Sequence, residues 1–320
     1  MNKKGIFFTF ITVLLILVIL SAYLIKTSYS PTASIQKSRA KVIAINAFVK
    51  SFDSIIERAL QASSKQTIIS SLDYISTSAP KAYIPSFKAE FPGIIYTGKY
   101  NGQDLIKMED TNPKSMNLRN TLHMVQGISK DSNIYLTYSP VTLQDITIQH
   151  LSPWEIEVAL TLKNIVVSDS SELSETEVSW NLGDRTIRTK LYITDYPDPL
   201  TLKENGEELT IRKSTITEFN QKTDLDNFIA EQSFIAHGDG PNFLQRISGE
   251  FTNDINGIER VLDGKRGNDP TPTESFVDFY YWGAFNDVAN IPSCDVEGYH
   301  PRIRLDNKHK VYYTTAPCQP

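Results

Sequence analysis

The sequence has no recognisable catalytic or nucleotide-binding motif. Its five histidines form neither an HxH nor an HExxH pattern, and a GxSxG turn, a GxGxxG fingerprint and a Walker loop are all missing. The enzyme classes that depend on those motifs are therefore excluded. The sequence predicts no catalytic residues, no metal site and no cofactor, and it favours a non-enzymatic protein over an enzyme.

The chain also has no excess of positive charge. It carries 32 Lys and Arg against 37 Asp and Glu, which gives a formal net charge of −5 and an isoelectric point near 5.6. Because nucleic-acid binding depends on a basic surface, this balance predicts no nucleic-acid partner. A hydrophobic content of 40% with 22% charged residues is typical of a folded chain rather than a disordered one.

Cysteine is scarce, with Cys294 and Cys318 as the two instances in the chain. They lie 24 residues apart near the end of the sequence, and each follows a proline closely. No CxxC spacing is present, which disfavours a zinc cage. In an oxidising compartment the pair is expected to form a disulfide, worth about 3 kcal/mol in the chain-entropy model. Two unrelated buried thiols are the alternative.

One long apolar run stands at the start of the chain. From Ile6 to Ile25 no charged residue occurs in 20 positions. A helix of that length spans roughly 30 Å, the thickness of the hydrocarbon core of a bilayer. We therefore expect a single-pass transmembrane helix over 6–25, with the lipid bilayer as a partner. The disulfide argument favours a topology with the N-terminus inside and the C-terminal domain extracellular.

The residues just before this run resemble the leader of type IV pilin-like proteins, also called a class III signal peptide. Lys3-Lys4-Gly5 directly precedes the apolar helix. The resemblance implies cleavage between Gly5 and Ile6, removal of residues 1–5, and retention of the helix as an anchor and a filament core. Bacterial pilins usually carry Glu at the fifth mature position, where this chain has Phe10, so the resemblance is to archaeal members. A plain signal anchor and a cleaved secretory signal remain alternatives.

Proline and glycine are absent from Ala33 to Ser78. Apolar residues recur there at spacings of three and four, which predicts an amphipathic helix within 26–79 that ends before Pro80. An anchor helix that continues onto a β-rich domain is the general shape of a type IV pilin subunit. A stalk helix packed on its own domain is the simpler interpretation.

The fold class expected for the remainder is α+β. Residues 80–216 are expected to form an antiparallel, β-rich ectodomain that is sandwich-like, with a strongly twisted sheet as the alternative. Its first part is predicted to be irregular, with short strands at Gly93–Tyr100 and Leu105–Met108 and a short helix near Leu118–Val125. Period-two alternation and turn signals, including an Asn205-Gly206 hairpin, then predict strands at Ile134–Tyr138, Ile146–Leu151, Trp154–Val167, Glu177–Leu182, Thr186–Ile193 and Leu209–Lys213.

Residues 217–320 are predicted to be a mixed α/β region that contains the disulfide. Asp224 is expected to cap one helix, Asn242–Phe251 to form a second, and Asn256 to open a third short element. The apolar segment Phe276–Trp282 is predicted to be a strand.

This half of the chain is also similar to uncharacterised archaeal cell-surface proteins with class III leaders. The resemblance implies a location rather than a chemistry. The segments that carry it are Tyr196–Leu200, Gly240–Arg246, Asn256–Glu259, Val277–Tyr280 and Arg304–His309.

The most site-like cluster is the segment from His237 to Gly240. A His and an Asp two residues apart on a glycine-hinged loop are able to bind a metal or transfer protons, although a simple turn is the more common reading. The favoured function is a membrane-anchored structural or adhesive subunit, a minor type IV pilin-like component that contacts other pilin-like subunits through residues 6–60. The alternative is an anchored surface enzyme or a ligand- or metal-binding module with a site near His237 and Asp239.

Overall fold

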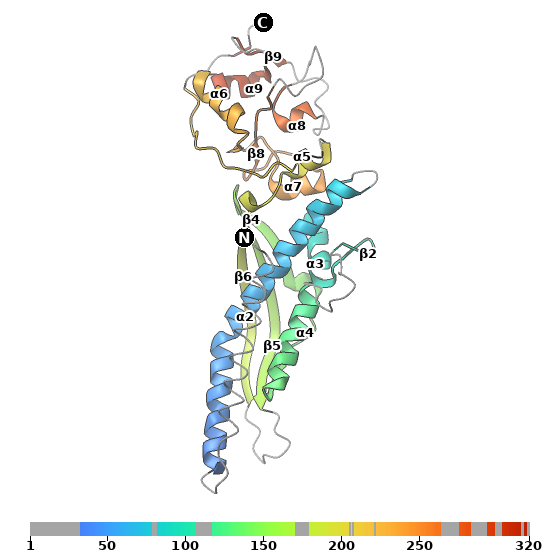
Figure 1. Cartoon of the computed structure of the whole chain (residues 1–320), viewed down its shortest axis with the longest axis vertical. Coiled ribbons are helices and arrows are strands. Elements are labelled where there is room, and N and C mark those ends of the chain that lie inside the picture. The colour runs from blue at the N-terminus through green and yellow to red at the C-terminus, as the bar shows by residue number, and fades with distance from the viewer. Residues whose placement is uncertain are drawn as a thin grey trace.

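The computed structural model describes a long helix, an antiparallel sheet and a compact region at one end of the sheet (Figure 1). The leader and the membrane span expected at 1–5 and 6–25 lie outside the described residues. The described residues are 33–78, 82–105, 117–169, 179–204, 206, 208–220, 222–263, 275–282, 293–297, 303–314 and 317–318.

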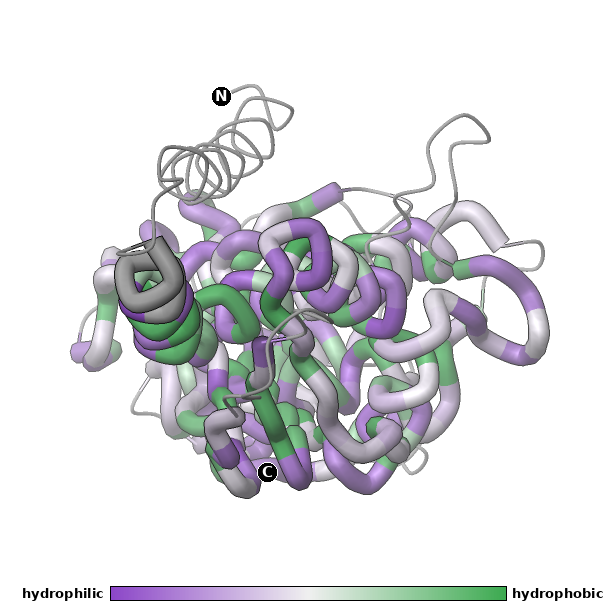
Figure 2. The backbone as a smooth tube through the Cα atoms, turned by 90° about the horizontal axis from the view of Figure 1, so that it is seen from below, coloured by the Kyte–Doolittle hydropathy of each residue, from purple (hydrophilic) through white to green (hydrophobic). Residues whose placement is uncertain are grey.

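The predicted long helix is confirmed as α2 (Ala33–Thr77), which runs for 45 residues. Viewed from below, its hydrophobic residues turn toward the rest of the molecule and its hydrophilic residues turn outward (Figure 2). The buried apolar positions follow the helical repeat at Ile45, Phe52, Ile56, Leu60, Ile68, Leu72 and Ile75.

The later part of α2 buries short polar side chains. The hydroxyls of Ser64, Thr67 and Ser71 each donate to the backbone carbonyl four residues earlier, so burial leaves no unpaired hydroxyl on these three residues. Their small size lets two short helices, α5 (Pro199–Glu204) and α7 (Phe243–Ser248), pack against α2.

The sheet is built around one long central strand, β5 (Glu155–Asp169). On one edge β5 pairs with β4 (Ile146–Ser152) and then, further along, with β3 (Ile134–Thr137), so these two strands lie end to end. On the other edge it pairs with β6 (Ser179–Tyr192). All pairings are antiparallel, which confirms the α+β class.

The sandwich expectation is wrong, because β3, β4, β5 and β6 form one four-stranded sheet with helices on one face, and the other described strands form three separate two-stranded pairs. Alternation along β5 explains this: Ile156, Val158 and Leu160 are fully buried on the helix side. On the opposite face, Glu155 and Glu157 pair with basic residues of β6. A sheet with one charged face has no second sheet to pack against.

The two strands predicted within 177–193 form one strand, β6. The break predicted between these two strands, at Gly183 and Asp184, is a bulge in the pairing with β5. Gly183 has a φ of +66°, and the Asp184 carboxylate accepts a hydrogen bond from the Asn164 backbone at 2.9 Å. Turn residues within a strand are also the signature of a bulge, which bends a strand without ending it.

Along the chain, four elements follow α2 before the first strand of the sheet. They are α3 (Phe87–Thr97), the short paired strands β1 (Lys99–Tyr100) and β2 (Gln103–Asp104), and α4 (Leu118–Asp131). The strand predicted from Gly93 is wrong, since α3 continues to Thr97 and ends on Gly98, whose φ is +77°. Phe87, Phe91, Ile94 and Ile95 are buried on one side of α3. The predicted helix near Leu118 is confirmed and is longer than expected, and residues 106–108 lie outside the described ones.

Beyond Tyr192 the chain forms a region of short elements, which we call the C-terminal region (193–318), as distinct from the helix-and-sheet region (33–192). A short 3-10 helix, η2 (Ile193–Asp195), joins the two regions. A similar 3-10 helix, η1 (Leu143–Asp145), precedes β4 in the helix-and-sheet region. The other elements are α6 (Lys222–Glu231), β7 (Ile235–Ala236), β8 (Ile258–Glu259), α8 (Asp278–Tyr281), β9 (Ser293–Asp295), β10 (Arg304–Asp306) and α9 (Asn307–Thr314).

Several sequence predictions for this region are wrong. The strand expected before Asn205-Gly206 is wrong, because Asp198 and Pro199 start the helix α5, in which the Asp198 carboxylate accepts from the Thr201 backbone at 3.0 Å. Asn205 itself lies outside the described residues. The strand predicted over Phe276–Trp282 contains the short helix α8. The short element expected at Asn256 is present, as a turn that leads into β8.

The helices predicted at Asp224 and Asn242 are confirmed as α6 and α7, with different bounds. The helix α6 begins at Lys222, so Asp224 lies in its first turn and accepts from the Asn220 backbone at 3.0 Å, and α7 ends at Ser248 rather than Phe251. Asn242 caps α7 by accepting from the Gln245 backbone at 2.9 Å. The cysteines are joined by a disulfide between Cys294 and Cys318, with the Sγ atoms 2.07 Å apart. Among the described residues, no helix combines the length and the apolar character that a membrane crossing requires.

Candidate functional site

Five separate segments of the chain meet in the core of the C-terminal region. Each of them contributes at least one buried charged side chain, from Asp198, Arg246, Glu259, Asp278, and the pair Asp306 and His309. Ionisable groups are rarely fully buried unless they are paired, so this concentration marks the region as the candidate site.

The first part of this core is an ion-pair network around Arg246 on α7. The Arg246 Nη1 lies 3.0 Å from the Asp198 carboxylate and 2.8 Å from the Asp278 carboxylate, and Nη2 donates to the Ile258 carbonyl at 2.6 Å. None of the three charged side chains is exposed. The Phe234 ring lies 5.7 Å from the guanidinium.

Burial acts in opposite directions on the charges of this network. Burial raises the pKa of Asp278, and the neighbouring Arg246 charge offsets only part of that effect. For Arg246, burial would lower the pKa, but the carboxylates of Asp278 and Asp198 outweigh it and raise the pKa above its usual range. Arg246 is therefore permanently charged, and the network holds α5, α7 and α8 together.

The second part is a cluster of two histidines and two carboxylates. The Glu259 Oε2 lies 3.0 Å from the His237 Nδ1 and 3.1 Å from the His309 Nε2. The other ring nitrogen of His309 lies 2.7 Å from the Asp306 carboxylate. The Tyr313 hydroxyl donates to the second oxygen of Glu259 at 2.7 Å.

The opposite charges of Glu259 and His309 offset the cost of burying each of them. Burial would raise the pKa of Glu259, but the charge of His309 and hydrogen bonds from both histidines hold it well below its usual range. Burial would lower the pKa of His309, but the carboxylates of Glu259 and Asp306 raise it to about 10. In the protein as described, His309 is therefore an imidazolium that donates from both ring nitrogens.

The turn that carries His237 is fixed by close backbone contacts. The His237 amide donates to the Gly257 carbonyl at 3.0 Å, and the Asp254 amide donates to the Gly240 carbonyl at 3.2 Å. A Cβ at Gly257 would lie 2.1 Å from the Gly240 oxygen, so no other residue fits there without displacing the turn. Glycine at this position therefore holds His237 against Glu259.

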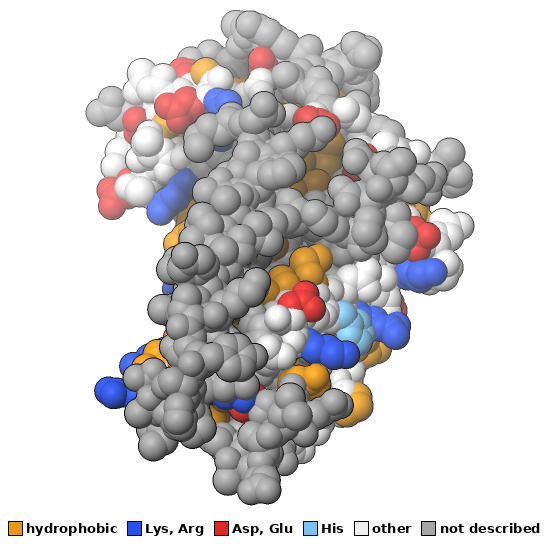
Figure 3. All heavy atoms as spheres, turned by 60° about the horizontal axis from the view of Figure 1, so that its bottom comes forward, with side chains coloured by type: hydrophobic (Ala, Val, Ile, Leu, Met, Phe, Trp, Pro, Cys, Tyr) orange, Lys and Arg blue, Asp and Glu red, His pale blue; other side chains and the backbone are white. Residues whose placement is uncertain are grey.

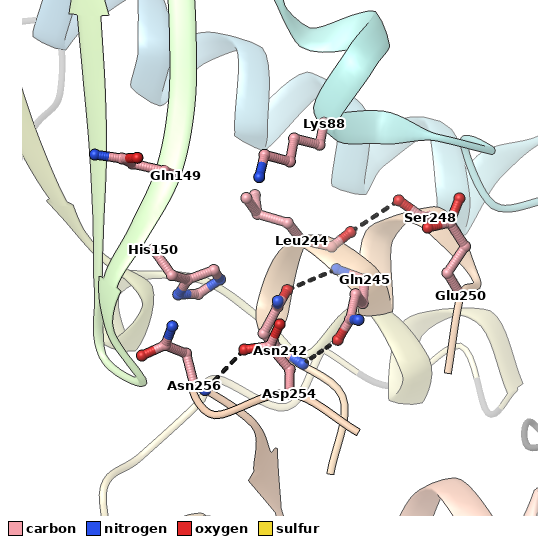
Figure 4. Close-up of a pocket in the computed structure, with 10 residues that line it drawn as sticks. All are labelled: Lys88, Gln149, His150, Asn242, Leu244, Gln245, Ser248, Glu250, Asp254 and Asn256. Carbon is pink, nitrogen blue, oxygen red and sulfur yellow. Dashed lines mark hydrogen bonds between the residues drawn. The ribbon is translucent and has the colours of Figure 1, made fainter. Parts of the chain in front are cut away.

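A separate polar pocket of about 370 Å³ lies between the two regions (Figure 4). Gln149 and His150 on β4 form one wall, Lys88 comes from α3, and α7 with the turn after it forms the other wall. The His150 Nδ1 lies 3.1 Å from the Ser152 carbonyl and its Nε2 is buried without a partner. Burial lowers the pKa of His150, so the ring is neutral and Nε2 is an acceptor.

Most polar groups of this pocket already take part in structural hydrogen bonds. Asn242 and Gln245 form the capping box of α7, and Ser248 accepts from the Phe87 backbone at 3.0 Å. Glu250 accepts from the Ser86 backbone at 3.1 Å. The pocket is therefore best described as a polar seam that joins α3 to α7.

The sequence-predicted site residues have different outcomes. Cys294 and Cys318 are joined as expected, and Gly5 and Ile6 lie outside the described residues. His237 and Asp239 are brought near each other, with Nδ1 and Oδ2 3.7 Å apart, but Glu259 is the closer partner of His237. Sequence reasoning gave no role to Glu259 or His309, because 22 and 72 residues separate them from His237 and no local spacing links them.

On the face drawn in Figure 3, the described Lys and Arg side chains lie among hydrophobic and acidic ones rather than in a continuous basic surface.

No family model matches this chain, and no curated protein or solved structure is significantly similar to it.

Proposed function

We propose that this chain is a membrane-anchored extracellular subunit with a structural or adhesive role, a minor type IV pilin-like component. Residues 6–25 hold it in the cell membrane as a single span with the N-terminus inside. The observation that carries the proposal is α2, which begins soon after the apolar run and lies along one face of an antiparallel sheet. A helix of this kind joins an anchor to a display domain.

The first turns of α2 extend past the end of the sheet. Lys41 pairs with Asp169, the last residue of β5, at 2.8 Å, so the turns before Lys41 lie beyond the strand (Figure 1). Near this point Ile43 is 60% exposed, so an apolar side chain is accessible on the part of α2 next to the end of the sheet. This supports residues 6–60 as the surface for other pilin-like subunits.

The disulfide is consistent with an extracellular location. Disulfides persist in oxidising compartments and are rare in the cytosol of most cells. The bond links the segment of β9 to the end of the chain after α9. It therefore closes the outermost part of the C-terminal region.

The N-terminal sequence of the native protein tests this proposal. We expect the mature chain to begin at Ile6, and Gly5→Leu to leave the leader attached and the protein confined to the membrane, because a class III peptidase requires a small residue at the cut. Gly5→Ala is the matched control and should still be cleaved. A native terminus at Met1 or Asn2, with normal surface display of Gly5→Leu, would contradict the pilin-like role and leave a plain anchor.

A further inference from the structure

We propose that His237, Glu259 and His309 bind a divalent transition-metal ion, with Zn²⁺ as the ion that best fits the donor set. Two imidazole nitrogens and one carboxylate oxygen form a common three-residue zinc set. The three donor atoms all lie within 4.8 Å of one another. The site is independent of the anchor and of any assembly into a filament.

Two of the three distances between donors are close to those around a small tetrahedral ion. Glu259 Oε2 lies 3.0 Å from His237 Nδ1 and 3.1 Å from His309 Nε2. Ligand distances of about 2.0–2.1 Å around a tetrahedral zinc place neighbouring donors roughly 3.3 Å apart. The two pairs therefore need only a small expansion to admit the ion. The ion takes the place of the proton that His309 Nε2 donates to Glu259, so binding releases that proton.

The groups behind the donors are arranged as in a metal site. Asp306 faces the His309 nitrogen that points away from Glu259, at 2.7 Å, and so fixes the orientation of the ring. Asp306 is held in turn by Ser275 and by the His309 backbone, at 3.0 and 3.1 Å. The second oxygen of Glu259 is occupied by Tyr313. A carboxylate behind a ligating histidine is the usual outer-shell partner.

The three donors come from rigid and separate elements. His237 follows β7, Glu259 lies in β8, and these strands pair directly, with Ile235 opposite Glu259. His309 lies in α9, whose Tyr313 reaches the same carboxylate. A bound ion would tie the paired strands to the last helix of the described chain.

The site has one open side. Glu259 and His309 are fully buried, whereas 16% of the His237 side chain is exposed. Asp239 lies on this open side, with its carboxylate 3.7 Å from the His237 nitrogen. An ion would enter there, and Asp239 is placed to supply a fourth ligand or to hold a water molecule.

The test uses the full-length protein in detergent, stripped with a chelator and then titrated with Zn²⁺ by calorimetry and elemental analysis. We expect one Zn²⁺ per chain and a higher Tm with the ion, because a ligand that binds only the folded state stabilises it. His237→Gln should weaken binding by more than about 100-fold, since removing even an outer-shell partner costs roughly 10–100-fold. His123→Gln, an exposed residue of α4, is the matched control and should bind normally.

Two further measurements keep the proposal falsifiable if His237→Gln does not fold. Co²⁺ in the unmutated protein should give the visible absorption of a tetrahedral site, and Ca²⁺ and Mg²⁺ should not compete, because they prefer all-oxygen ligands. An octahedral Co²⁺ spectrum, equal competition by Ca²⁺, the absence of stoichiometric Zn²⁺, or unchanged binding by folded His237→Gln would each overturn the assignment. None of these outcomes would affect the N-terminal processing that tests the pilin-like role.

Discussion

The helix-and-sheet region and the C-terminal region bury different kinds of side chain. In the helix-and-sheet region the buried carboxylates Asp145 and Asp169 pair with lysines that reach the surface. In the C-terminal region the central pairs have both partners buried, as in Arg246 with Asp198 and Asp278, while outer pairs such as Lys308 with Asp239 reach the surface. The first region is therefore specified mainly by apolar pattern, whereas the second depends on an ionic core.

This difference changes what a single substitution does. A buried ion pair adds little net stability over an apolar core, because desolvation offsets the attraction. Removing one partner is costly, however, because the other charge stays buried alone. The C-terminal region should therefore tolerate surface changes but respond sharply to changes in its charged residues.

The largest expected effect is that of Arg246→Met. The substitution leaves the Asp198 and Asp278 carboxylates buried without their guanidinium, so we expect the free energy of unfolding to fall by about 3–5 kcal/mol. Urea unfolding of the full chain measures the loss. The matched control is Arg185→Met, which removes an exposed pair with Asp53 in the other region and should cost at most about 1 kcal/mol. Equal losses in the free energy of unfolding for the two variants would contradict the proposed difference between the two regions.

A smaller effect is expected from removing the disulfide with Cys294→Ser and Cys318→Ser together. Opening a loop of this length should lower stability by about 3 kcal/mol. Hydrogen exchange should show the lost protection in β10 and α9 but not in β5, since the bond lies wholly within the C-terminal region. Equal loss of protection in β5 would show that the two regions unfold as one unit.

The smallest expected effect on stability is that of Asp145→Asn, and it depends on pH in the acid range. The Lys163 ammonium and the hydrogen bonds from Thr142 outweigh burial and lower the pKa of Asp145 to about 2. A carboxyl with a lowered pKa stabilises the fold above its unfolded pKa of about 3.9, and that contribution is lost as the pH falls toward the folded value. The stability difference between wild type and variant should therefore vanish as the pH falls from about 4 to about 2. If the difference persists at the lowest pH, neutral hydrogen bonds rather than the ion pair produce it.

Much of the helix-and-sheet region was predictable from the sequence. The apolar spacing of α2 and the alternation along β4 and β5 follow directly from which residues face the core. The errors arose at glycine and proline, because each of these residues occurs both at the end of an element and within one. Gly183 marks a bulge rather than a turn, and Pro92 lies inside α3 rather than ending it.

The candidate site of the C-terminal region was much less predictable. Its residues come from segments that are distant in sequence, and each segment alone reads as a turn or a short apolar stretch. Buried pairing of Glu259 with two histidines depends on tertiary contacts that no local spacing encodes. Asp198 was predictable in part, because Asp before Pro199 is a helix start signal.

The course of α2 has a mechanical consequence for a protein held at a surface. Soon after α2 ends, the Ile84 amide donates to the Ile247 carbonyl at 3.1 Å and the Phe87 amide donates to the Ser248 hydroxyl at 3.0 Å. Tension between the start of α2 and the C-terminal region would therefore pass along this helix and directly into α7. The sheet lies beside this path rather than within it, so its strands would stay paired while the helix carried the load.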